Sequence, residues 1–147
     1  MLALRLVRLI ESHSDELAEG LMNKIRNSDR TTEYRRLPAE ELRAAAGDIY
    51  HNLGDWLLTK TDSDLEVRYT QLGARRGAQR VPISQVLWAI LLSKEHLWAF
   101  LQREAIVEGP VQLFGELELL QLLEQFFDRA VYYAVVGYER AEQRKAA

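Results

Sequence analysis

Histidine is the residue type in this sequence best suited to acid–base chemistry, and the chain contains three of them. His13 lies between Ser12 and Asp15, residue types that nucleophilic catalysis can combine. Positions this close on one helix do not bring a hydroxyl, an imidazole and a carboxylate into a relay. Glu95 and His96 form an acid–imidazole neighbour pair, but the flanking residues lack the rest of a histidine-kinase phosphoacceptor pattern. We therefore assign structural or solvent-facing roles to both histidines.

The patterns of common metal and cofactor sites are also absent from the sequence. The chain has no cysteine, which excludes disulfide scaffolds, thiolate zinc sites, iron–sulfur clusters and thiol catalysis. No His-x-x-x-His or Glu-x-x-His pair offers metal-ligand spacing. The eight glycines are dispersed and form no phosphate-binding loop. We predict a non-enzyme with no catalytic residues, no cofactor and no metal ion.

Three arginines, Arg75, Arg76 and Arg80, cluster near the end of a predicted helix. Positive side chains complement the negative end of the helix dipole, which explains the cluster without any ligand. Contact with an anion or a partner is the functional alternative. The sequence leaves both interpretations open.

Composition indicates which elements must carry these residues. Ala, Glu, Lys, Leu and Arg make up half of the 147 residues, a bias typical of amphipathic helices. The net charge of −3 does not favour nucleic acid or an anionic membrane, and no apolar stretch reaches the length of a membrane span. We predict one all-α domain over residues 1–147, located in the cytoplasm.

Breaker residues and apolar spacing divide the chain into about five helices. Pro38 and Pro82 suit first helical positions, Ser63 with Glu66 forms a capping box, and Gly109-Pro110 marks a stop and restart. These signals predict helices over about residues 1–26, bent near His13, and over 38–60, 63–80, 82–107 and 110–144.

Two glycines and the last helix point to close helix packing. Gly73 and Gly77, four residues apart, weaken their helix by about 1 kcal/mol each but let another helix approach closely. The last helix is apolar on two adjacent sides, so it is either central to the bundle or shared with a second subunit. On the second interpretation the dimer interface and signal helix contain Phe127, Val131, Ala134 and Tyr138, and residues 139–147 begin a signalling helix or tail.

A set of aromatic and aliphatic residues recurs at helical spacing through the middle of the chain. Such residues ordinarily fill a core. The alternative is a pocket for a small apolar ligand, a fatty acid or a tetrapyrrole including haem. Its predicted lining is Ile49, Leu53, Trp56, Tyr69, Trp88 and Leu92.

Four segments carry a resemblance to a known family: 14–17 (SDEL), 34–42 (YRRLPAEEL), 72–77 (LGARRG) and 81–87 (VPISQVL). Together they resemble the N-terminal sensory domain of RsbR-type stressosome regulators, the RsbRD-type domain. The resemblance covers nearly the whole chain and implies a globin-like, all-helical input domain. It also implies a homodimer that signals to a protein output partner or a fused output domain, such as a STAS domain, a kinase or a transcription regulator. The chain ends at Ala147, either as an isolated input domain or as part of a longer protein.

The globin-like fold that the resemblance implies raises the question of haem. If the last two helices match the final pair of a globin, the proximal ligand would come from about residues 65–80. That segment has no histidine, cysteine or methionine, only Tyr69. His51 would then lie on the distal side and His96 on the penultimate helix. We therefore expect a non-haem domain that acts by conformational change through its last helix.

Overall fold

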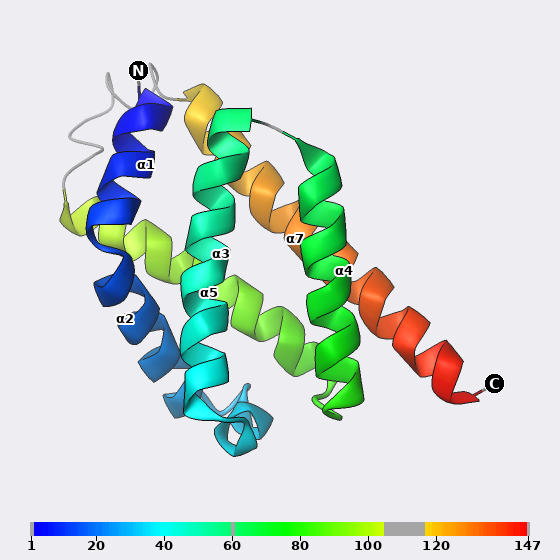
Figure 1. Ribbon diagram of the computed structural model, residues 1–147. Helices are drawn as coiled ribbons and strands as arrows, with labels where there is room; N and C mark the ends of the chain where they lie inside the picture. Colours follow the sequence, from blue (N-terminus) through cyan, green and yellow to red (C-terminus); the bar gives the residue numbers. More distant parts are fainter. Residues whose placement is uncertain (1, 60, 105–116, 147) are drawn as a thin grey trace.

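The computed structural model describes residues 2–59, 61–104 and 117–146, and all regular structure there is helical (Figure 1). This confirms the predicted all-α bundle with a long C-terminal helix. The elements are α1 (Leu2–Ser12), α2 (Ser14–Asn27), the 3₁₀ helix η1 (Thr32–Arg36), α3 (Ala39–Thr59), α4 (Asp62–Ala78), α5 (Ile83–Arg103) and α7 (Leu117–Ala146).

The predicted bend near His13 is a break between α1 and α2, which raises the number of described α-helices to six. The backbone N–H of His13 donates to the carbonyl of Leu9 over 3.1 Å, and ring Nδ1 lies 3.0 Å from the same oxygen. The ring packs edge-on against Phe100 of α5, with centroids 5.3 Å apart. The backbone of His13 itself is not helical, with φ −121° and ψ 19°, so α1 ends before this residue and α2 begins after it.

The start of α4 differs from the sequence prediction. The helix begins at Asp62 and its N-cap is Thr61, whose side chain makes no capping bond, so the capping box at Ser63 and Glu66 is wrong. The Asp62 carboxylate accepts from Trp56 Nε1 over 3.3 Å and from Arg129 over 2.9 Å. These two bonds hold Asp62 in the first turn, so the helix begins one residue before Ser63.

The other described helix boundaries lie close to the predicted ones. Pro38 and Pro82 directly precede α3 and α5, so each proline stands one residue before the predicted first helical position, and Pro82 is the N-cap of α5. The helix α5 ends at Arg103 rather than near residue 107. The predicted restart at Gly109-Pro110 lies outside the described residues.

The helices pack around one apolar core. Each of the six described helices contributes fully buried side chains, among them Leu6 of α1, Leu17 of α2, Leu53 of α3, Leu65 of α4, Leu97 of α5 and Phe126 of α7. In Figure 1, α3 and α4 stand side by side while α5 crosses behind them and α7 passes behind α4. The C-terminal end of α7 extends beyond α4 (Figure 1).

Candidate functional site

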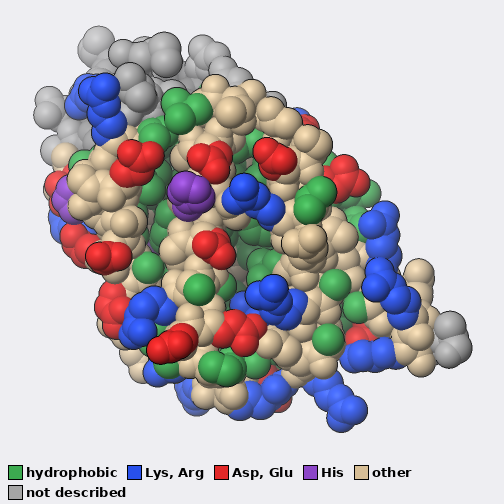
Figure 2. Space-filling view, viewed as in Figure 1, with side chains coloured by type: hydrophobic (Ala, Val, Ile, Leu, Met, Phe, Trp, Pro, Cys, Tyr) green, Lys and Arg blue, Asp and Glu red, His purple; other side chains and the backbone are tan. Residues whose placement is uncertain are grey.

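A cavity of about 380 Å³ lies between α3 and α4. The α3 side of it includes three consecutive alanines, Ala44, Ala45 and Ala46, whose short side chains leave space toward α4. The remaining walls come from α2, α5 and Tyr34 of η1. In the space-filling view, apolar side chains show in the depth between α3 and α4, with charged side chains at the rim (Figure 2).

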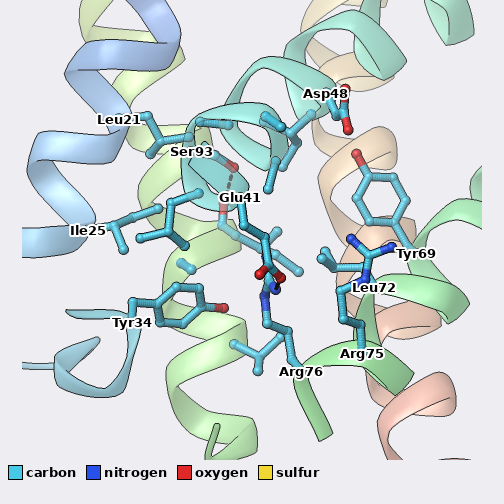
Figure 3. Close-up of a pocket in the computed structure, with 18 of the residues that line it drawn as sticks. Leu21, Ile25, Tyr34, Glu41, Asp48, Tyr69, Leu72, Arg75, Arg76 and Ser93 are labelled. Atoms are coloured by element: carbon cyan, nitrogen blue, oxygen red, sulfur yellow. Dashed lines mark hydrogen bonds and ion pairs between the residues drawn. The ribbon is translucent and has the colours of Figure 1, made fainter. Parts of the chain in front are cut away.

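The wall away from α4 is apolar. Leu21 and Ile25 of α2 face into the cavity, opposite the arginines of α4 (Figure 3). The Ser93 hydroxyl donates a hydrogen bond to the carbonyl of Ile90, and the Ser93 carbonyl accepts one from the Tyr50 hydroxyl over 2.9 Å. This end therefore presents little besides hydrocarbon. Its further lining residues are Leu42, Ile49, Val86, Ala89 and Ile90.

The α4 wall carries a buried arginine. Arg76 is 2% exposed, and its NH1 group donates to Glu41 over 2.7 Å and to Gln79 over 2.8 Å. Gln79 donates in turn to the same Glu41 oxygen over 2.7 Å. This bond from Gln79, with the bond and charge of Arg76, holds the pKa of Glu41 below its usual range despite partial burial. Within the described part of the chain, Arg76 Nε is buried without a hydrogen-bond partner.

A second polar group in the cavity lining consists of Asn52, Tyr69 and Arg68. Asn52 donates to the Tyr69 hydroxyl over 3.4 Å and accepts from Arg68. Burial raises the pKa of Tyr69, so this phenol stays neutral. Asp48 stands beside the Tyr69 hydroxyl at the opening (Figure 3). Tyr69 is thus a neutral, bonded side chain and not a free anionic ligand.

The arginine cluster of the sequence is divided by the fold. Arg75 and Arg76 line the cavity, whereas Arg80 does not. Arg80 lies after the end of α4, and its backbone is in the left-handed region with φ 62°. Arg68 joins Arg75 and Arg76 at the rim; it lies seven residues before Arg75 and therefore on the same face of α4. That spacing is the signal that sequence analysis could have used for Arg68. Glu41, Asp48 and Asn52 come from α3, and their approach to these arginines required the fold.

The structure brings only part of the predicted pocket together. Ile49 and Tyr69 line the cavity, but Leu53, Trp56, Trp88 and Leu92 do not. Leu53 and Trp56 are buried in the core, where Trp56 meets Phe126 of α7. Trp88 lies under the guanidinium of Arg30, 4.4 Å from its ring centroid, and Leu92 packs partly buried against the core. Helical spacing alone does not distinguish the cavity-facing side of a helix from its other buried sides.

The opposite face of α4 packs on α7 with no space between the two backbones. A Cβ atom on Gly73 would lie 1.9 Å from the carbonyl oxygen of Ala134, and one on Gly137 would lie 1.9 Å from that of Thr70. Gly77 is less crowded, since its Cβ would lie 3.5 Å from the nearest atoms of Tyr138 and Ala141. The predicted close approach is confirmed at Gly73. It joins α4 and α7 as one unit.

Two polar bonds support this contact near the C-terminal end of α4. The Tyr138 hydroxyl donates to the carbonyl of Val81 over 2.8 Å. Lys145 Nζ donates to the carbonyl of Gly77 over 2.9 Å, where a positive charge complements the helix dipole. The last turns of α7 are therefore bonded to the end of α4.

The residues predicted for a dimer interface face the chain's own helices. Phe127 and Ala134 are buried within the single chain, Val131 is half-buried, and Tyr138 packs against Gly77 of α4. The outward side of α7 instead presents Tyr132, which is 64% exposed. A dimer contact through α7 would use this outward side.

The histidines do not converge on a common site. His51 is exposed on α3 and lies 3.4 Å from Asp55. His96 is half-buried on α5, where burial lowers its pKa, and none of the three histidines lines the cavity. Among the described residues, no three His, Cys, Asp or Glu side chains are grouped closely enough to hold a metal ion. None of the described helices is long and apolar enough to cross a membrane.

Comparison with known proteins gives one family. Residues 15–147 match the RsbT co-antagonist protein rsbRD N-terminal domain, which takes in nearly all of the chain. No curated protein and no solved structure matches it.

Proposed function

Because the chain belongs to the rsbRD N-terminal domain family of stressosome regulators, we propose that it is a non-catalytic, cytoplasmic input domain working as a homodimer. A signal received by the bundle changes the packing of α7, and α7 passes the change to an output domain or a protein partner. A globin-like arrangement of the helices is part of this proposal.

The observation that carries the proposal is the double role of α4. One face of this helix lines the cavity through Arg68, Leu72 and Arg75. The other face touches α7 backbone to backbone at Gly73. A shift of α4 toward or away from the cavity therefore cannot leave α7 in place. Packed helices respond to such shifts by changing between discrete arrangements, which suits a switch.

Hydrogen exchange tests the coupling. Ala46→Leu places a larger side chain in the cavity, on the α3 wall. We expect altered exchange protection in residues 130–141 of α7 as well as around the cavity. Gly47→Ala is the matched control, because a Cβ there meets nothing within 4 Å. A change confined to α3 and α4 would contradict transmission through α7.

Light scattering tests the homodimer. We expect a mass of two chains at micromolar concentration and a shift toward monomer in Tyr132→Glu, which puts a charge on the outward side of α7. A monomer in the unaltered protein would contradict this part of the proposal.

A second candidate function is the binding of a small apolar ligand, and the cavity favours it. Its volume lies within the range of pockets that hold small organic molecules. Haem does not fit the lining, which contains no histidine, cysteine or methionine. Its two tyrosines are Tyr34 and Tyr69, and burial raises the pKa of both, which disfavours the phenolate that binds haem iron. Visible spectra after addition of haem check this point, because a Soret shift lost in a Tyr69→Phe variant would contradict it.

A further inference from the structure

We propose that the cavity binds an amphiphilic carboxylate, with its carboxylate group held by the arginines of α4 and its apolar chain lying against α2 and α5. The inference rests on the proposed input function and names the class of ligand that the cavity takes. Three properties of the cavity support it.

The first is the separation of apolar and charged walls. Leu21 and Ile25 stand on one side and Arg75 and Arg76 on the other (Figure 3). A ligand that is apolar throughout would leave the α4 wall without partners, and a small anion would leave the hydrocarbon wall exposed to water. A molecule with one charged end and one apolar end satisfies both walls.

The second property is the unused donor of a buried arginine. Arg76 is almost wholly buried and points up into the cavity toward Glu41 (Figure 3). Its Nε–H has no acceptor within the described part of the chain, although a buried N–H of this kind is normally bonded. A guanidinium offers five donors, and Glu41 and Gln79 accept from NH1 alone. A carboxylate oxygen of a ligand would supply a further acceptor.

The third property is the balance of charge at the rim. Glu41 offsets Arg76, which leaves Arg68 and Arg75 against Asp48 among the charged lining residues. Neither Arg68 nor Arg75 forms an ion pair with another described residue. The charged lining residues therefore leave one positive charge, which favours a ligand with a single negative charge. A doubly charged phosphate would meet repulsion from Glu41 and Asp48.

This arrangement also explains how such a ligand would act. The carboxylate would bond to α4, the helix whose other face is joined to α7 at Gly73. The apolar chain would contact α2, α3 and α5. Binding would thus set the distance between α4 and the rest of the bundle, and with it the position of α7.

Titration calorimetry on the full chain tests the ligand class with three probes. Octanoate carries both ends, octanol carries the apolar end without charge, and acetate carries the carboxylate alone. We expect octanoate to bind at least about tenfold more tightly than either of the others, the size of one charge-assisted hydrogen bond. Equal binding of octanol or acetate would overturn the proposal.

Two variants test whether an arginine of α4 binds the carboxylate group of the ligand. Arg75→Gln, at an exposed position that tolerates substitution, should weaken octanoate binding about tenfold and leave octanol binding unchanged. Arg43→Gln is the matched control, since Arg43 lies on α3 outside the cavity and pairs with Glu19. An equal effect of both substitutions, or none from Arg75→Gln, would also overturn the inference.

Failure here is distinguishable from failure of the input function. If no probe binds while the dimer persists and α7 still responds to Ala46→Leu, the ligand class is wrong and the input function stands. If octanoate binds as expected but α7 does not respond, the transmission is wrong and the ligand class stands.

Discussion

The two faces of α4 are packed in opposite ways. Toward α7 the helices approach so closely at Gly73 and Gly137 that no side chain fits between them. Toward α3 the same helix leaves a cavity of about 380 Å³, lined by alanines on one side and by arginines on the other. One helix thus combines a contact that resists change with a contact that leaves room for it.

The difference indicates where this domain can respond to its surroundings. A backbone contact without free volume moves as a unit, because close-packed groups transmit displacement. A ligand that binds in the open, partly charged cavity stabilises the folded protein. The cavity side is therefore the place for input and the glycine side the place for output. Five predictions follow, in order of decreasing effect.

Gly73→Ala should have the largest effect. The added methyl would lie 1.9 Å from the Ala134 carbonyl oxygen, so α4 and α7 must separate, at a cost of about 3 kcal/mol or more. Urea denaturation measures the loss.

Gly77→Ala is its matched control, four residues further along the same helix. The methyl there makes ordinary contacts at 3.5 Å, and the gain in helix propensity should change stability by less than about 1 kcal/mol. Similar losses in both variants would mean that the contact at Gly73 is not unusually tight.

Glu41→Gln should have the next largest effect, because it leaves buried Arg76 without its charged partner. We expect a loss of about 2 kcal/mol at neutral pH. Glu19→Gln, in an exposed pair with Arg43, should cost less than about 0.5 kcal/mol. Chemical denaturation compares the two, and equal costs would contradict the special role of the cavity pair.

The same carboxylate predicts a response to acid. The pKa of Glu41 is lower in the folded chain than its ordinary value of 4.5, so the unfolded chain binds this proton more readily. Its stabilising contribution is present above about pH 4.5 and is lost as the pH falls through the folded value. The Glu41→Gln variant should lose less stability than the unaltered protein over this acid range.

Ala46→Leu should change stability by no more than about 1 kcal/mol, because the larger side chain enters existing space in the cavity. Ala130→Leu, at a fully buried position of α7, should cost about 2 kcal/mol or more. Thermal melts of the two variants check the contrast. A large loss for Ala46→Leu would show that the cavity does not accept added volume.

The smallest effect concerns His96 at the contact between α2 and α5. Burial lowers the pKa of His96 below its ordinary value of 6.5, and its ring lies over Gly20. The unfolded chain therefore takes up this proton first, so stability falls as the pH drops below about 6.5. His96→Gln should flatten the dependence between pH 6.5 and 5, while His51→Gln, at an exposed site, should not. Melting temperatures across this range check the difference.

Several features of the fold could be predicted from local chemistry. The two prolines before α3 and α5 act through their fixed backbone geometry, and the contact at Gly73 depends on the absence of a side chain. The capping box at Ser63 failed because the side chains that bind Asp62, from Trp56 and Arg129, are distant in the sequence.

The candidate site shows the same division between local and distant chemistry. The sequence by itself determined an all-α chain, a close helix approach at Gly73 and an arginine cluster with two open interpretations. Only the tertiary structure decided that Arg75 and Arg76 face a cavity while Arg80 does not, and that Phe127 and Ala134 pack inside the chain. Helical periodicity identifies which residues share a face. Which neighbour that face meets depends on how all the helices bury their apolar surface together.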